Sequence, residues 1–102
     1  MDLVISVYGA TRDFPKTETF GLTSQMRRAA VSVPSNIAEG HALKQTQAYS
    51  RHLAIASGSL AELQTQIEIV RRLGYSGAWE NLIGSAREVA RMLAGLRRSL
   101  RA

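Results

Sequence analysis

Apolar residues recur at helical spacing along almost the whole chain, and no stretch alternates apolar and polar residues as a half-buried strand would. The clearest pattern lies between Thr46 and Leu73. It predicts a long bundle helix with Thr46 as its N-cap and Gly74 just beyond its end. The apolar positions step by four and three without a break: Tyr49, Leu53, Ala56, Leu60, Leu63, Ile67 and Val70.

A second long helix is predicted after a short turn around Ser76, which is the expected N-cap, with Glu80 as a favourable charge in the first turn. Two long helices joined by a short turn form an antiparallel hairpin, whose apolar faces need further helices to cover them. The apolar positions of this helix are Trp79, Leu82, Ala86, Val89, Leu93, Leu96 and Leu100, widened by Ile83 and Ala90.

The first half of the chain predicts the helices that complete the bundle. A short first helix precedes a loop at residues 13–21, and Thr23 is the expected N-cap of a second helix. We therefore expect an all-α protein, an antiparallel up-and-down four-helix bundle in a single domain of residues 1–102. The inward positions are Leu3, Val4, Val7 and Tyr8 in the first helix, and Leu22, Met26, Ala29, Ala30, Val33 and Ile37 in the second.

Pro34 lies in the middle of the second predicted helix, where proline costs about 3 kcal/mol. One hypothesis explains it by a second, weakly apolar strip of this helix that contacts another subunit, with Pro34 bending the helix to fit. The alternative is a kink around the subunit's own core, in which Ser32 or Ser35 repairs the loosened carbonyls. The residues assigned to the subunit interface are Arg27, Val31, Pro34 and Ala38.

Composition narrows the class of protein. The chain is 45% hydrophobic and 21% charged, which is typical of a globular domain. It has no cysteine, which excludes disulfides and thiolate chemistry. The first residues lack both a basic segment and an apolar run long enough for a signal peptide or a membrane span. A cytoplasmic protein without membrane association is therefore expected.

Catalysis and metal binding are not expected. The only histidines, His41 and His52, lie in different segments without a metal-binding motif around them. Glu39 is better explained by a bond to Arg28 or to a nearby amide than by acid–base chemistry. Gly58, inside a long helix, indicates close helix packing rather than a phosphate loop. We expect no enzyme activity and no cofactor.

Positive charge gathers towards the C-terminus. The net charge is +5, and residues 78–102 hold five arginines against two glutamates. This imbalance suggests a polyanionic partner, although charge alone speaks only to non-specific binding. The candidate nucleic-acid-binding residues are Arg87, Arg91, Arg98 and Arg101. The alternative is a solvated charged face in which Glu88 pairs with Arg91.

Two blocks of the sequence, "SQMRRAAVSVPSNIAEG" and "GSLAELQTQ", carry a family resemblance. The chain resembles the bacterial four-helix-bundle proteins encoded within intervening sequences of 23S ribosomal RNA genes. The resemblance implies a bundle that assembles into ring-like homopentamers. It also implies kinship with the accessory proteins of diversity-generating retroelements, which are basic and work with nucleic acid.

Two functional hypotheses follow from different classes. The first is an oligomer that binds nucleic acid, with structured RNA favoured, through its basic face. The second is an oligomeric scaffold that presents surfaces to a protein partner, its basic residues serving solubility. Only 6% of the residues are aromatic, and Tyr49 and Trp79 are assigned to the core, which disfavours recognition of single strands by stacking.

Overall fold

The computed structural model describes residues 1–19 and 21–101, without the side chain of Arg101, and within this range all regular structure is helical. This confirms the all-α expectation. The elements are α1 (Asp2–Thr11), a single 3₁₀ turn η1 (Lys16–Glu18), α2 (Leu22–Ala42), α3 (Thr46–Arg72) and α4 (Trp79–Arg101). The turn η1 lies within the expected loop, and Phe20 of that loop lies outside the described residues.

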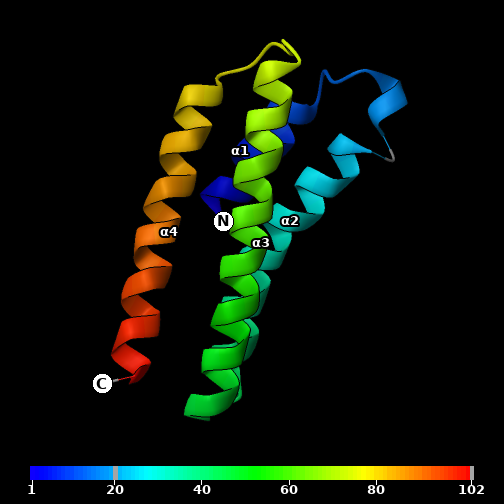
Figure 1. Cartoon of the computed structure of the whole chain (residues 1–102). Helices are drawn as coiled ribbons and strands as arrows, with labels where there is room; N and C mark the ends of the chain where they lie inside the picture. The colour runs from blue at the N-terminus through cyan, green and yellow to red at the C-terminus, as the bar shows by residue number, and fades with distance from the viewer. Residues whose placement is uncertain (20, 102) are drawn as a thin grey trace.

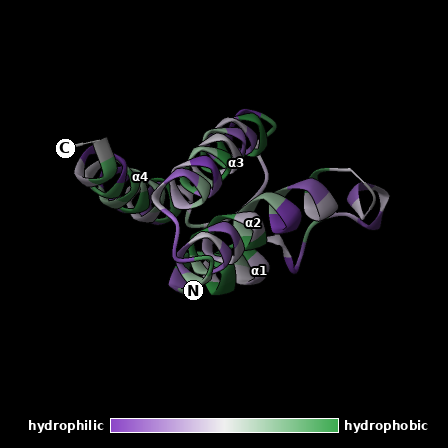
Figure 2. Cartoon of the chain, turned by 90° about the horizontal axis from the view of Figure 1, so that it is seen from below, coloured by the Kyte–Doolittle hydropathy of each residue, from purple (hydrophilic) through white to green (hydrophobic). Residues whose placement is uncertain are grey.

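The three long helices run side by side along a molecule that measures 44 Å in its longest dimension (Figure 1). α3 lies between α2 and α4, and packs against both. α1 contacts α2 and α4 from the other side, so that it completes the fourth position of the bundle. Seen along the bundle, α1 lies beside α2 while α4 stands apart from α2 (Figure 2). The chain therefore forms a bundle around α3.

The core follows the apolar pattern of the sequence except at Tyr8, which was expected to face inward and is 43% exposed. Along α3, the side chains of Leu53, Leu60, Leu63 and Ile67 are almost completely buried, which confirms the predicted seam. Each buried side chain of this size contributes roughly 1.5–3 kcal/mol through removal of its apolar surface from water. The helices around α3 add the other buried apolar side chains, among them Leu3, Val7, Met26, Ala30, Val33, Trp79, Leu82, Ala86 and Leu93.

Helix starts differ from the sequence expectation by one or two residues. α3 begins at Thr46, with Gln45 as the residue before it, and α2 begins after Gly21; neither start has a side-chain cap. Thr46 and Thr23 are therefore not the N-caps that we expected. The Ser76 assignment is also wrong, because the amide of Leu82 bonds to the carbonyl of Ala78 and places the start of α4 there. Packing of the apolar stripes fixes these starts, and the hydroxyl residues do not.

The end of α3 agrees with the expectation. Gly74 has a φ of +81°, in the left-handed region that favours glycine. Its amide donates to the carbonyl of Arg71 at 3.1 Å, and the amide of Tyr75 donates to that of Val70 at 3.2 Å. This pair of bonds is the Schellman motif, which satisfies the last carbonyls of a helix. The motif ends α3 and turns the chain towards α4.

An aromatic cluster joins the α3–α4 turn to the segment after α1. The ring of Phe14 makes edge contacts with Tyr75 and Trp79, at centroid distances of 5.0 and 5.8 Å. The Trp79 indole donates to the Tyr75 carbonyl, and the Tyr75 hydroxyl donates to the Glu18 carboxylate at 2.8 Å. That hydrogen bond raises the pKa of Tyr75. The cluster ties both connections together at one end of the bundle.

The close approach of two helices occurs at a different glycine from the one we expected. Gly58 is exposed, and a Cβ added there would meet nothing within 4 Å, so its assignment to close packing is wrong. Gly40, near the end of α2, is buried against α3. A Cβ at Gly40 would lie 2.7 Å from the Cβ of His52 and 3.0 Å from the ring of Tyr49. Only glycine lets α2 and α3 come this close.

We expect opposite effects from two alanine substitutions. Gly40→Ala should destabilise the protein by about 1–3 kcal/mol, because the new methyl group forces α2 away from α3. Gly58→Ala should stabilise it by about 0.5–1 kcal/mol, because alanine favours the helix and the position is open. Urea denaturation followed by circular dichroism measures both changes. Equal effects of the two substitutions would contradict the close contact at Gly40.

Candidate nucleic-acid interface and subunit surface

The arginines of α4 lie in one row on the surface. Arg87, Arg91 and Arg98 are spaced by four and seven residues, which places them on one side of the helix over about 16 Å. All three are exposed. Arg101 belongs to the last turn of α4, but its side chain lies outside the described residues. α4 is helical throughout this stretch, and binding of nucleic acid by the row remains a prediction.

This arginine row holds no ion pair within residues 1–19 and 21–100. The expected pair of Glu88 with Arg91 is not formed, so this part of the charged-face alternative is wrong. Among the same residues, all ion pairs lie at the turn between α3 and α4. Cationic side chains without an acidic partner leave their full charge available to a polyanion.

The acidic groups on either side of the α3–α4 turn are paired with arginines. Arg71 contacts Glu68 at 2.8 Å and Glu80 at 2.9 Å, and Arg72 contacts Glu68 at 3.0 Å. Hydrogen bonds from these guanidinium groups lower the pKa of Glu68. The cluster lines a shallow pocket between α3 and α4 that Arg87 also borders. Positive charge therefore becomes dominant only beyond this pocket, towards the end of α4.

Two further basic residues lie at the end of the bundle where α4 finishes. Figure 1 shows the last turn of α4 at the same end as the start of α3. Lys44 precedes that start and Arg51 lies in its second turn, and both are exposed. The sequence pattern alone does not place them at this end, because that depends on the antiparallel arrangement of α3 and α4. Arg51 lies on the side of α3 opposite to Leu53 and Leu60, so the two residues share an end of the bundle with α4 but do not continue its arginine row.

The predicted interface strip lies on the side of α2 next to α1. Val31 and Ala38 are exposed, and Pro34 is half-buried. Arg27 is occupied within the subunit: its Nε donates to Thr11 Oγ1 at 2.9 Å, and its guanidinium lies 4.5 Å from the centre of the Tyr8 ring. Arg27 thus ties α2 to α1, and contact of the strip with another subunit remains a prediction.

A polar network surrounds Pro34 and links α2 to α3. The Asn36 amide donates to the Ser32 carbonyl at 2.8 Å and accepts a hydrogen bond from His52 Nδ1 at 3.0 Å. The hydroxyl groups of Ser32 and Ser59 lie 2.7 Å apart. Among the described residues, neither Ser32 nor Ser35 bonds to the carbonyl that Pro34 leaves free. The expected serine repair is therefore not observed, and cross-helix bonds stabilise this region instead.

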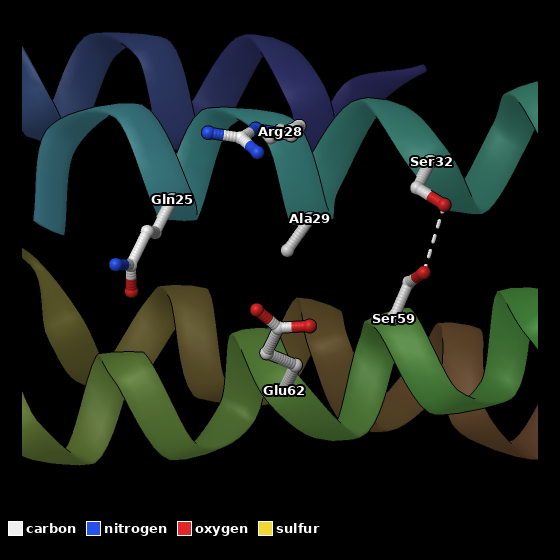
Figure 3. Close-up of a pocket in the computed structure, with 6 residues that line it drawn as sticks. All are labelled: Gln25, Arg28, Ala29, Ser32, Ser59 and Glu62. Carbon is white, nitrogen blue, oxygen red and sulfur yellow. Dashed lines mark hydrogen bonds between the residues drawn. The ribbon is translucent and has the colours of Figure 1, made fainter. Parts of the chain in front are cut away.

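A half-open pocket lies along the same seam (Figure 3). It is lined by Gln25, Arg28, Ala29, Ser32, Ser59 and Glu62. Glu62 accepts a hydrogen bond from the buried Gln66 at 3.3 Å. Glu39 lies three turns of α2 away from Arg28, so the proposed bond between them is wrong. The pocket combines hydroxyl, amide and charged groups without a grouping typical of catalysis.

Metal-binding groups and membrane-spanning helices are absent from the residues that the structure describes. No group of three or more histidine, aspartate or glutamate side chains that could hold a metal ion occurs in them. Within the same residues, no helix is both long and apolar enough to span a membrane.

Comparison with known proteins identifies the family. The sequence model of the 23S rRNA-intervening sequence protein family matches residues 1–95. The chain therefore belongs to this family, which confirms the resemblance noted in the sequence. No curated protein matches the chain closely. The kinship with retroelement accessory proteins remains an expectation.

We expect Asn36→Ala to destabilise the protein by about 1–3 kcal/mol, because it leaves polar groups of Ser32 and His52 without their partner. Ser35→Ala is the matched control, because Ser35 is the exposed neighbour of Asn36. This substitution should change the free energy of unfolding by no more than about 0.5 kcal/mol. Chemical denaturation measures both. If Asn36→Ala lowers the free energy of unfolding no more than Ser35→Ala does, the hydrogen-bond network of Asn36 adds no stability.

Proposed function

We propose that this member of the 23S rRNA-intervening sequence protein family is a non-enzymatic homo-oligomer that binds structured RNA through the basic face of α4. The proposal rests on one observation. Arg87, Arg91 and Arg98 are exposed in one row, without an ion pair among the described residues. Each guanidinium presents a planar set of donors suited to a phosphate, and Arg101 is assigned to the same face.

The preference for structured RNA follows from what surrounds the arginines. Trp79 is buried, and Phe14 and Tyr75 pack against each other at the opposite end of the bundle. Tyr49 is half-buried against the ring of His41. Proteins that bind single strands use exposed aromatic rings on which bases stack. Phosphate contacts to a folded RNA backbone fit this surface better, and they carry no sequence information directly.

Self-association is supported by the apolar side of α1 and α2. Val31 of the predicted strip is exposed, as are Ile5 and Tyr8 on the neighbouring α1. Apolar side chains gathered on one face are typical of interaction surfaces. We propose that Val31, Pro34 and Ala38 contribute to a homo-oligomeric contact, with five subunits as the number that the family resemblance implies.

The second candidate is a scaffold that binds a protein and has no direct role with nucleic acid. The same exposed apolar side chains favour it, because a partner protein could cover them. Purification without nuclease distinguishes the two functions through the 260/280 nm absorbance ratio before and after high salt. Nucleic acid released by salt favours RNA binding, whereas protein that is clean throughout favours the scaffold.

Replacement of Arg87, Arg91 and Arg98 by Gln should weaken RNA binding and lower its salt-dependence slope by roughly two to three units per contacting subunit. Affinity should fall about equally for unrelated RNA sequences. The measurement is fluorescence anisotropy with a labelled structured RNA over a salt series. The matched control carries Lys16→Gln, Arg28→Gln and Arg72→Gln, which remove the same charge from other surfaces. An equal loss of RNA affinity in both variants would show that binding depends only on the net charge of the protein.

Pro34→Ala should raise the thermal midpoint of the subunit, because a proline inside a helix costs about 3 kcal/mol. The same substitution should weaken assembly if the bend at Pro34 shapes the interface. Light scattering coupled to size exclusion gives the particle mass. Subunits have a mass of 11.1 kDa, so a pentamer has about 55 kDa. A wild-type monomer would contradict the proposed oligomer, and an unchanged oligomer in the variant would identify Pro34 as a tolerated kink.

A further inference from the structure

The half-open pocket between α2 and α3 has two opposite charges on its walls (Figure 3). Arg28 borders it from α2 and Glu62 from α3, and both side chains are exposed. Among the residues that the structure describes, neither takes part in an ion pair. Arg28 instead lies along α2, where it donates to the hydroxyl of Ser24 at 3.5 Å. Below, this cavity is called the α2–α3 pocket.

The carboxylate of Glu62 is held in place by a buried glutamine. Gln66 is 4% exposed, and its Nε2 donates to Glu62 Oε1 at 3.3 Å. The other end of this amide, Gln66 Oε1, is buried and has no hydrogen-bond partner among the described residues. Because a buried acceptor without a partner destabilises a protein, its presence requires an explanation other than stability. The arrangement fixes Glu62 and leaves its Oε2 free to accept from a ligand.

A chain of hydrogen bonds positions a hydroxyl group at one end of the α2–α3 pocket. His52 Nδ1 and Asn36 Oδ1 lie 3.0 Å apart, and Asn36 Nδ2 donates to Ser32 Oγ at 3.0 Å. Ser32 Oγ in turn lies 2.7 Å from Ser59 Oγ (Figure 3). Because Ser32 already accepts from Asn36, its own hydrogen is available for Ser59, and the hydrogen of Ser59 is available to the pocket.

These groups surround one small space. Figure 3 shows the carboxylate of Glu62 directed from α3 towards α2, with the amide of Gln25 to one side of it and Ser59 to the other. The volume of the pocket is about 280 Å³. Sites for small molecules measure about 300–1,000 Å³, so this pocket suits a ligand at the small end of that range. Ala29 is the only apolar side chain in the lining, and the ligand is therefore expected to be strongly polar.

We propose that the α2–α3 pocket binds a free α-amino acid with a short side chain. The ammonium group of the ligand contacts Glu62 and the hydroxyl of Ser59. Its carboxylate contacts Arg28 and the amide of Gln25, and its side chain packs against the methyl group of Ala29. The ligand thereby joins α2 to α3 through two charges that the protein leaves unpaired. This site is separate from the arginine row of α4 and does not depend on RNA binding.

Other small ligands match the two charges less well. A phosphate or a simple carboxylate beside Arg28 is repelled by Glu62, and an amine without a negative group leaves Arg28 unpaired. A nucleobase has groups for both side chains, but the lining contains no aromatic ring on which a base stacks. A molecule with both charges forms charge-assisted hydrogen bonds at each end, and these are roughly twice as strong as neutral ones. The pocket therefore favours a zwitterion.

Titration calorimetry and thermal unfolding with glycine, alanine and serine as free ligands test the site. At least one of the three should bind and raise the thermal midpoint, because a ligand that binds only the folded state stabilises it. The amide form of that amino acid lacks the negative charge, and the N-acetyl form lacks the positive charge. Each should bind at least about tenfold more weakly. If none of the three amino acids binds, or if either analogue binds as tightly, the proposal is wrong.

Two substitutions assign the ends of the ligand. Arg28→Gln and Glu62→Gln should each weaken binding of the amino acid at least about tenfold, and both leave the core unchanged because the side chains are exposed. Arg51→Gln and Glu88→Gln are the matched controls, because they make the same charge changes at exposed positions outside the lining. They should keep the wild-type affinity. Equal losses in the controls would show that the amino acid responds only to net charge and would overturn the site.

Gln66→Leu separates the positioning role of Gln66 from a structural one. The substitution removes the buried acceptor that has no partner, so the thermal midpoint of the ligand-free protein should rise. It also removes the hydrogen bond that holds Glu62, so binding of the amino acid should weaken. Stability and affinity are thus expected to move in opposite directions. A variant that binds the amino acid as tightly as the wild type would overturn the role assigned to Gln66.

Discussion

The contact between α2 and α3 determines where the other helices lie. Gly40 lets the two backbones approach, and hydrogen bonds from Ser32 and Asn36 link α2 to α3 on either side of Pro34. With α2 fixed on one side of α3, the remaining apolar surface of α3 is covered by α4. α1 then bridges α2 and α4. Polar contacts between α2 and α3 lie in the same region as the proline, so the two helices stay joined on both sides of it.

The sequence predicts the helices well because their apolar stripes are long and regular. Every residue of the seam from Leu53 to Val70 is buried, and Gly74 ends α3 as expected. Helix starts are predicted less well, because Thr23, Thr46 and Ser76 are equally good caps in isolation, and packing selects other residues. The two glycines show the same limit. Whether Gly40 or Gly58 lies at a close contact depends on which side of its helix faces α3.

Some residues of the candidate site can also be predicted from the sequence, and others cannot. The row of Arg87, Arg91 and Arg98 depends only on periodicity within one helix, so the sequence suffices to predict it. Lys44 and Arg51 lie at the same end of the bundle as the last turn of α4 only because α3 and α4 are antiparallel. Arg27 pairs with Thr11, which is 16 residues away in the sequence, and no local pattern indicates that contact. Residues that act within one helix are predictable, and those that act between helices are not.

The two proposed surfaces lie on different sides of the bundle. The strip of Val31, Pro34 and Ala38 lies on α2 beside α1, whereas the arginine row is turned away from the side of α4 that meets α1. Subunits joined through the α1 side therefore keep their arginines free, and an assembly repeats the basic row once per subunit. Each row offers only a few phosphate contacts, which give weak, salt-sensitive binding. Repetition on one particle raises the total affinity through effective concentration, provided that the RNA reaches several rows at once. A folded RNA of sufficient size meets this condition, and short oligonucleotides do not.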